Sequence, residues 1–138
     1  MVKKLIITIL LLATSIFAQE IHWAKDFKTG IAEAKKENKP VLFISSRHTC
    51  KYCVILEKTA LSDKRIIKAL NRDFISIISY SDENDYIPRK LWSPGTPTIW
   101  FLYPTTKPMF KAIPGAIDAK NFLNALSIVK TEFDKNKK

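Results

Sequence analysis

The sequence predicts an α/β protein in which helices flank a central mixed β-sheet. Three short apolar runs, at residues 41–45, 74–78 and 98–102, have the composition of buried strands. Between and after these runs lie segments in which apolar residues recur every three or four positions, as on one face of a helix. Strands that alternate with amphipathic helices are typical of a layered α/β domain.

The first helix is expected to begin at Trp23. From there the apolar residues recur at intervals of four and three positions with charged residues between them, at Trp23, Phe27, Ile31 and Ala34. Asn38, Lys39 and Pro40 interrupt this pattern, and the first strand, residues 41–45, follows directly.

Two helical segments and a second strand are expected in the middle of the chain. The first, residues 50–59, begins where the first strand ends, and Ser62 and Asp63 are expected to cap the second. This second helix runs through Leu70, with Ile66 and Ile67 on the same face as Leu70. After the strand at 74–78 come a polar loop at 81–85 and a short helix or turn at 88–92.

The last part of the chain predicts a hairpin and a closing helix. A turn at residues 104–107 joins the strand at 98–102 to an edge strand at 109–113, which Pro114 and Gly115 end. Asp118 is expected to cap the last helix, whose buried face comprises Phe122, Leu126 and Val129, with Ala125 beside it. With no internal repeat or linker, residues 19–138 are expected to form one domain.

The first eighteen residues have the layout of a secretory signal peptide. Lys3 and Lys4 precede an apolar run from residue 5 to 17, and Ala18 follows at the expected cleavage site. The run is shorter than the about 20 residues that a membrane-spanning helix needs. We therefore expect export to the periplasm, with an uncleaved N-terminal membrane anchor as the alternative.

The chain is basic, with a net charge of +10. Such a charge is compatible with nucleic acid or anionic membrane partners. The lysines, however, are scattered over helix faces and the C-terminus, and there is no zinc-finger spacing, RNA-binding aromatic signature or basic stripe. We interpret the charge as a solvated surface and expect a monomer that does not bind nucleic acid.

Both cysteines of the chain lie in the stretch RHTCKYC, as Cys50 and Cys53, directly after the first strand. Residues three apart at a helix start lie on one face, within reach of a disulfide. As a structural crosslink the pair would contribute little, because so short a loop restricts the unfolded chain only slightly. A helix N-terminus instead stabilises a thiolate, with Lys51 and protonated His48 adding to the effect. We therefore expect Cys50 to be a redox nucleophile and Cys53 the resolving thiol.

Two other uses of the cysteine pair fit the sequence poorly. A zinc site would need two more ligands, and the chain offers only His22 and His48, at no familiar spacing. Covalent haem attachment needs a histidine directly after the second cysteine, where this chain has Val54. We expect no metal and no cofactor.

An apolar strand that ends in CxxC at a helix start, and a later Gly95-Thr96-Pro97-Thr98 before a strand, resembles the thioredoxin superfamily. Over residues 23–130 the chain is most similar to small periplasmic domains related to the C-terminal domain of thiol:disulfide interchange reductases. This closer similarity lies in the segment KPVL at 39–42, in the CxxC with Glu57 after it, and in the helix that starts at residues 62–63.

The resemblance implies a thioredoxin fold and roles for further residues. Pro97 is expected to be cis, and the backbone of Thr96 to pair with an extended substrate. Glu57 matches an acid that tunes thiol protonation in the reductase domains, so it is a candidate proton acceptor for Cys53, or an ordinary solvated glutamate. Tyr52, between the cysteines, is a candidate substrate contact. Trp92 and Trp100 are expected to pack in the core, with a role at the rim of a peptide groove as the alternative.

The chain departs from these relatives at two positions. Ile44 stands six residues before Cys50, where they place a buried aspartate, and Thr49 stands where they usually carry a tryptophan. The first change removes an acid that serves the second cysteine, and the second alters the docking surface.

The sequence therefore predicts an exported thiol:disulfide oxidoreductase that reduces, or relays electrons to, disulfides of extracytoplasmic proteins. Its partners would be protein thiols and disulfides, together with a membrane electron donor. A disulfide oxidase or isomerase is one alternative, because stabilising the thiolate favours the oxidising direction. A non-catalytic binding module that uses the Pro97 groove is the other.

Overall fold

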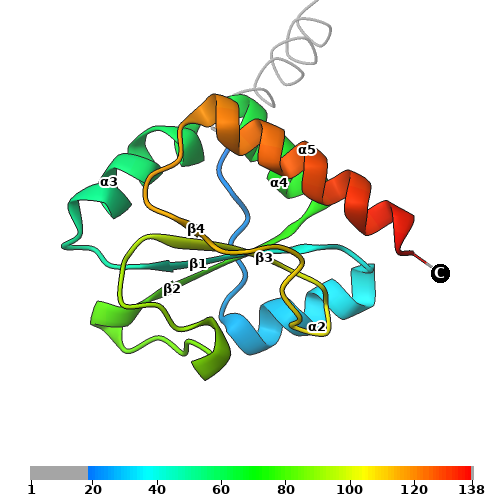
Figure 1. Cartoon of the computed structure of the whole chain (residues 1–138), viewed down its shortest axis with the longest axis horizontal. Helices are drawn as coiled ribbons and strands as arrows, with labels where there is room; N and C mark the ends of the chain where they lie inside the picture. Colours follow the sequence, from blue (N-terminus) through cyan, green and yellow to red (C-terminus); the bar gives the residue numbers. More distant parts are fainter. Residues whose placement is uncertain (1–18, 138) are drawn as a thin grey trace, which may run out of the picture.

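A mixed sheet forms the centre of the computed structural model, which describes residues 19–137 (Figure 1). In that part of the chain the strand order is β2-β1-β3-β4. The central strand β1 (Val41–Ser46) pairs in parallel with β2 (Ile75–Tyr80) and antiparallel with β3 (Thr98–Leu102). The prediction of a mixed sheet is confirmed.

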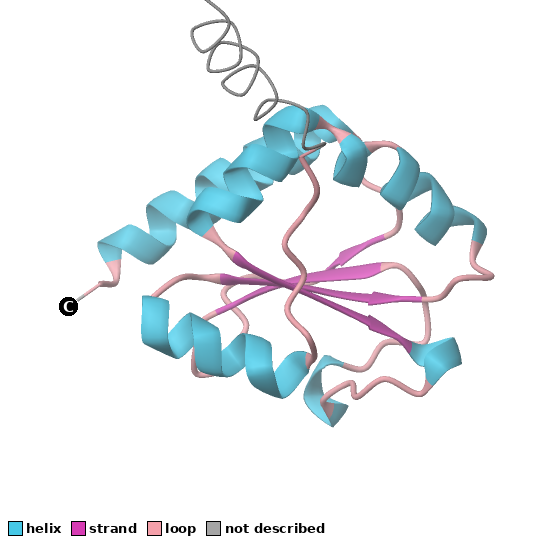
Figure 2. Ribbon diagram, turned by 180° about the vertical axis from the view of Figure 1, so that it is seen from behind, coloured by secondary structure: helices cyan, strands magenta, loops and turns pink. Residues whose placement is uncertain are grey.

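Helices cover both faces of the sheet (Figure 2). Helix α2 (Phe27–Glu37) lies on one face. The other face carries α3 (Lys51–Lys58), α4 (Lys64–Asp73) and α5 (Ala119–Lys135). Short 3₁₀ turns lie between these elements, namely η2 (Ala60–Ser62), η3 (Ser81–Glu83) and η4 (Arg89–Leu91).

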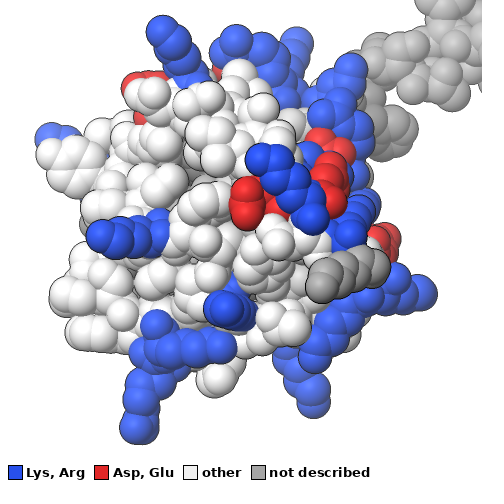
Figure 3. Space-filling model, turned by 45° about the vertical axis from the view of Figure 1, so that its right-hand side comes forward, with Lys and Arg blue, Asp and Glu red and all other residues white. Residues whose placement is uncertain are grey.

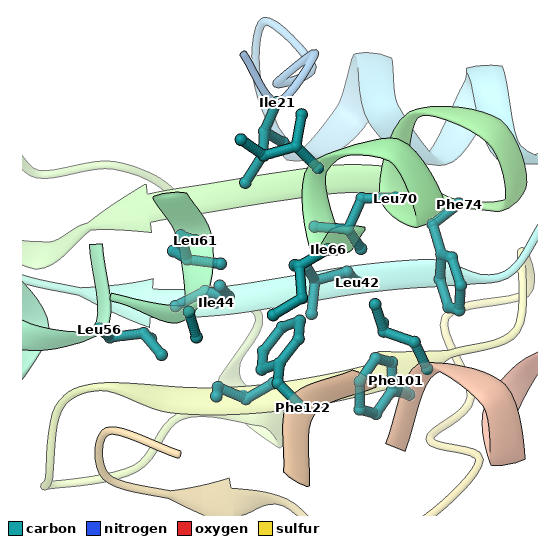
Figure 4. Packing of buried hydrophobic residues seen from close by; sticks show 14 of the residues in the cluster. Ile21, Leu42, Ile44, Leu56, Leu61, Ile66, Leu70, Phe74, Phe101 and Phe122 are labelled. Carbon is teal, nitrogen blue, oxygen red and sulfur yellow. The ribbon is translucent and has the colours of Figure 1, made fainter. Parts of the chain in front are cut away.

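Strand β1 is buried along its whole length because its side chains alternate between two apolar clusters. Leu42 and Ile44 belong to the cluster under α3, α4 and α5, where Phe122 also lies (Figure 4). Val41 and Phe43 belong to the cluster under α2. The CxxC motif follows directly after this buried strand, so the core packing of β1 fixes the position at which the motif begins.

The first helix begins later than the sequence suggested. Asp26 caps α2, with its Oδ1 accepting the backbone N–H of Thr29 at 2.7 Å, so the helix starts at Phe27. Trp23 instead forms an isolated parallel bridge with Ser76 of β2. The expected start at Trp23 is therefore wrong, because the apolar spacing continues past the capping residue.

The edge strand is shorter than expected. The edge strand beside β3 is β4, which comprises Ile113–Pro114, whereas a strand was predicted over residues 109–113. The backbone N–H of Met109 donates to the Phe101 carbonyl at 2.8 Å, beside an isolated bridge at Pro108. Pro108 and Pro114 lack the N–H that a continuous ladder needs, which is why the pairing remains local. The predicted turn before it is present, since the N–H of Tyr103 donates to the Lys107 carbonyl at 2.9 Å.

The remaining boundaries agree closely with the prediction. Asp63 caps α4 and Asp118 caps α5, and the buried side chains of α5 include Phe122, Leu126 and Val129. The expected signal peptide, residues 1–18, lies outside the described residues. Within residues 19–137, no helix has the length and apolar character needed to cross a membrane.

Candidate functional site

Cys50 lies at the junction of β1 and α3, as the N-cap residue of the helix. Its Sγ accepts the backbone N–H of Cys53 at 3.2 Å, in the place where a serine or aspartate oxygen would otherwise cap. Cys50 is partly exposed, whereas Cys53 is only 1% exposed, and both are free thiols. The first thiol is thus accessible to a partner while the second is shielded behind it.

Hydrogen bonding favours the ionised form of Cys50. Burial alone would raise the pKa of this thiol, but hydrogen bonds from the Cys53 thiol, the Thr96 side chain and the backbone of Cys53 and Tyr52 outweigh it. The pKa of Cys50 therefore lies below its ordinary value. Thr96 also acts in the opposite sense, because its carbonyl oxygen accepts from the Cys50 S–H at 3.3 Å, which favours the thiol.

Cys53 is shifted the other way. Burial raises the pKa of its thiol, and the hydrogen bond that it donates to Cys50 raises it further. The side chains of Ser46 and Thr96 oppose this shift by stabilising the Cys53 thiolate. Two cysteines with pKa values displaced in opposite directions are suited to different roles. Cys50 is suited to attack a disulfide first, and Cys53 can attack only after a base has taken its proton.

The loop before β3 approaches the cysteines from the other side. The Thr96–Pro97 peptide bond is cis, the form that the resemblance implies. Thr96 is half-buried and contacts Cys50 through its carbonyl oxygen, while the carbonyl of Pro97 accepts the N–H of Gly115 at 2.9 Å. Tyr52 is 57% exposed at the start of α3. Thr96 therefore lies against the accessible cysteine, while the Tyr52 side chain faces solvent.

Glu57 lies one turn after Cys53 on α3, but its hydrogen-bond partner comes from the neighbouring strand. The phenol of Tyr80, the last residue of β2, donates to Glu57 Oε1 at 2.8 Å. Burial, and then the hydrogen bond to Glu57 and the charge of that carboxylate, raise the pKa of Tyr80, and the charges of Glu83 and Cys53 contribute in the same direction. The candidate proton acceptor is thus held by a tyrosine, one helical turn from Cys53.

The motif is also fixed from the side of β2. The ring of His48 stacks on Tyr80, with centroids 3.9 Å apart, and its Nε2 lies 2.8 Å from Glu83 Oε1. The His48 backbone N–H donates to Asp82 at 2.8 Å. Sequence reasoning missed Tyr80 and Glu83, because the parallel pairing that places Ser46 opposite Tyr80 brings the end of β2 beside the CxxC. It also missed Ser46, whose hydrogen bond to Cys53 depends on the three-dimensional arrangement at the end of β1.

Three other predicted positions have different outcomes. Ile44, at the position where the relatives carry a buried aspartate, is fully buried among apolar side chains and is part of the hydrophobic core. Trp100 is half-buried and its indole N–H donates to the Leu91 carbonyl at 3.2 Å, as a packed tryptophan would. Trp92 is 64% exposed, so the expectation that it packs in the core is wrong.

Within residues 19–137 no group of three or more histidine, cysteine or acidic side chains has an arrangement that could hold a metal ion. On the face shown in Figure 3, Lys and Arg side chains lie mostly around the rim of a largely uncharged surface, with Asp and Glu side chains among those on the right.

The family model of the thioredoxin-like domain matches residues 27–130, most of the chain. The chain belongs to the thioredoxin-like family. Two solved structures share the fold of this thioredoxin-like domain. A thioredoxin from Thermus thermophilus has a TM-score of 0.70 at 23% identity, covering 83% of this chain and 90% of that chain.

The second structure is the C-terminal domain of DsbD from Neisseria meningitidis, in the oxidised form. It has a TM-score of 0.56 at 15% identity, covering 80% of this chain and 91% of that chain. Among curated proteins, anterior gradient protein 2 of Xenopus laevis is 31% identical over 84 residues. That match covers 55% of this chain and 45% of the relative, so the thioredoxin-like chain spans about half the length of that protein.

Proposed function

We propose that this thioredoxin-like protein is an exported thiol:disulfide oxidoreductase that reduces, or relays electrons to, disulfides of extracytoplasmic proteins. One observation carries the proposal: the partly exposed Cys50 caps α3, accepts the N–H of Cys53 and has a lowered pKa. An accessible thiolate beside a shielded second thiol is what two-step disulfide exchange requires.

In the reducing direction, the Cys50 thiolate attacks one sulfur of a substrate disulfide. A bond forms between Cys50 and that sulfur, and the other substrate sulfur leaves as a thiolate. Cys53 then loses its proton and attacks Cys50, which forms the Cys50–Cys53 disulfide and releases the second substrate thiolate. The two cysteines supply two electrons, and the two released thiolates take up protons. A membrane electron donor would then return the protein to the dithiol form.

The residues around Cys50 are suited to hold a substrate during this exchange. We assign substrate contacts to Thr96, whose carbonyl oxygen contacts Cys50, to Pro97 after it, and to the exposed Tyr52 between the two cysteines. Glu57 is the proposed proton acceptor for Cys53. The signal-peptide pattern of residues 1–18 and the similarity in fold to a DsbD domain support export to the periplasm.

One observation favours the opposite direction of transfer. A lowered pKa of Cys50 stabilises the reduced protein, which makes its disulfide a stronger oxidant. A disulfide oxidase or isomerase is therefore the second candidate. Its distinguishing property would be oxidation of a reduced substrate peptide by the Cys50–Cys53 disulfide.

Insulin reduction by the mature chain tests the proposal. We expect turnover in the presence of dithiothreitol, loss of turnover in Cys50→Ser, and mixed disulfides trapped through Cys50 in Cys53→Ser. A wild-type protein that is inactive both in this assay and in peptide oxidation would contradict the enzyme assignment and indicate a binding module.

A further inference from the structure

Tyr80 contacts both flanks of the cysteine motif. Its ring stacks on His48, two residues before Cys50, with 12° between the ring planes. Its hydroxyl donates to Glu57, four residues after Cys53. Its own backbone is fixed as well, because its N–H donates to Asp85 Oδ2 at 2.9 Å and β2 pairs with β1 along its length.

We infer that Tyr80 is a positioning residue for the second step of disulfide exchange: it holds the Glu57 carboxylate beside the shielded Cys53 so that this carboxylate receives the departing proton. This inference rests on the proposed redox function. The proposed function names Glu57 as proton acceptor but names no residue that positions it, and this is the role assigned to Tyr80. Ile44 occupies the place of the relatives' buried acid, so Glu57 is the acid that α3 itself offers near Cys53.

The environment of Cys53 requires such help. The thiol is buried with a raised pKa, so little of it is thiolate at neutral pH. A carboxylate on a surface helix would normally turn toward water and gain nothing from the thiol. The hydrogen bond from Tyr80 restrains Glu57 instead, and Glu57 lies one helical turn from Cys53 on α3.

The proton can leave from Glu57 to solvent. Glu57 and Tyr80 both line an open cavity of about 380 Å³, together with Gln19, Glu20 and Trp23. Water in this cavity would lie beside Glu57, and the residues that line the cavity do not include the proposed substrate contacts Tyr52, Thr96 and Pro97.

The charged and titratable groups that face Tyr80 come from several elements. They are Glu57 and Cys53 of α3, Glu83 of η3, Asp85 after it, His48 before α3, and Glu20 across the cavity. His48 is engaged by Glu83 through its Nε2, so it stacks on Tyr80 without displacing the bond to Glu57. The Tyr80–Glu57 contact is therefore the part of this group that a phenylalanine substitution would remove.

The test follows the two steps separately with 5,5′-dithiobis(2-nitrobenzoate) and the reduced, mature protein. Attack by Cys50 releases one thionitrobenzoate, and attack by Cys53 on the resulting mixed disulfide releases a second. In Tyr80→Phe we expect the second release near pH 7 to slow by about tenfold, less than the roughly 10²- to 10⁴-fold of a group that touches the reacting proton. The first release should stay within about twofold, because the hydrogen bonds that lower the pKa of Cys50 come from Cys53, Thr96 and Tyr52 and do not involve Tyr80.

The pH profile and a double variant identify the cause. The deficit of Tyr80→Phe should shrink as the pH rises through the ionisation of Cys53, since a thiolate needs no proton acceptor. Glu57→Gln should give the same profile, and the double variant should be no slower than Glu57→Gln. Tyr86→Phe, an exposed tyrosine beside Phe27, serves as the matched control and should behave as wild type.

Three outcomes separate the possibilities. If the second release in Tyr80→Phe is as fast as in wild type, the inference is overturned. It is also overturned if the double variant is slowed by the product of the two single-variant effects. An unchanged profile in Glu57→Gln overturns it independently of whether Tyr80→Phe folds. If the wild-type protein itself gives no second release, the redox function fails and the inference fails with it.

Discussion

The backbone N–H of Cys53 donates to Sγ of Cys50 at 3.2 Å, so the second cysteine of the motif stabilises the negative charge of the first. This relationship arises because Cys50 is the capping residue of α3 rather than a residue inside the helix. The accessible cysteine is thereby prepared for attack before any substrate arrives.

The ionisation of Cys50 should depend on the Cys53 side chain. In Cys53→Ala the backbone N–H remains, but the hydrogen bond from the thiol is lost, so the pKa of Cys50 should rise toward its ordinary value. Because a raised pKa leaves less thiolate, alkylation of Cys50 by iodoacetamide at pH 7 should be several-fold slower than in wild type. The measurement is the alkylation rate as a function of pH, followed by mass spectrometry. Identical profiles for the two proteins would show that the thiol of Cys53 has no such influence.

Ser46 should assist Cys53. Its side chain lies at the end of β1 and lowers the pKa of the buried thiol. Ser46→Ala should therefore slow the release of the second thionitrobenzoate at pH 7 by about tenfold, equivalent to about 1.4 kcal/mol from a hydrogen bond to a charged group. Ser76→Ala is the matched control, because the buried Ser76 hydroxyl has no hydrogen-bond partner in the part of the chain that the structure describes. Equal rates in Ser46→Ala and Ser76→Ala would remove Ser46 from the mechanism.

Gly30 should be required for the packing of α2 on the sheet. A Cβ at this position would lie 2.6 Å from Cδ1 and Cγ1 of the fully buried Ile77. Overpacking of this kind costs about 1–3 kcal/mol, which should exceed the about 1 kcal/mol that alanine adds to helix stability. We expect Gly30→Ala to lower the free energy of unfolding in urea, with insulin reduction retained by the folded protein.

Gly95→Ala provides the comparison for that experiment. No atom lies within 4 Å of a Cβ at this position, so its free energy of unfolding should stay within about 0.5 kcal/mol of wild type. If Gly30→Ala is as stable as Gly95→Ala, Ile77 has room to move and the close approach of α2 to β2 is not a constraint.

Much of the fold could be predicted from local patterns. The strand at 98–102 and the caps at Asp63 and Asp118 were recognisable because each depends on residues that are adjacent in the chain. The start of α2 was placed wrongly because the apolar spacing from Trp23 to Phe27 fits a helix as well as an extended segment followed by one. The edge strand was overestimated because the effect of prolines on pairing depends on which side of the strand has a neighbour.

The candidate site was predictable only in part, for a similar reason. Cys50 and Cys53 are close in sequence, so their spacing and their position after a strand were enough to indicate redox chemistry. Tyr80, from the end of β2, meets Glu57 through strand pairing, which no local pattern reveals. The exposure of Trp92 was mispredicted because an aromatic residue beside a 3₁₀ turn gives no local indication of whether it is buried or exposed.

The most direct test of the central proposal is the redox equilibrium of the Cys50–Cys53 pair against glutathione. We predict a reversible two-electron transition between the dithiol and one intramolecular disulfide, with a potential nearer to the about −270 mV of thioredoxin than to the about −120 mV of a strong disulfide oxidant. A potential close to the oxidant value would contradict the reducing role. Failure of the two cysteines to form an intramolecular disulfide at any glutathione ratio would contradict the redox function itself.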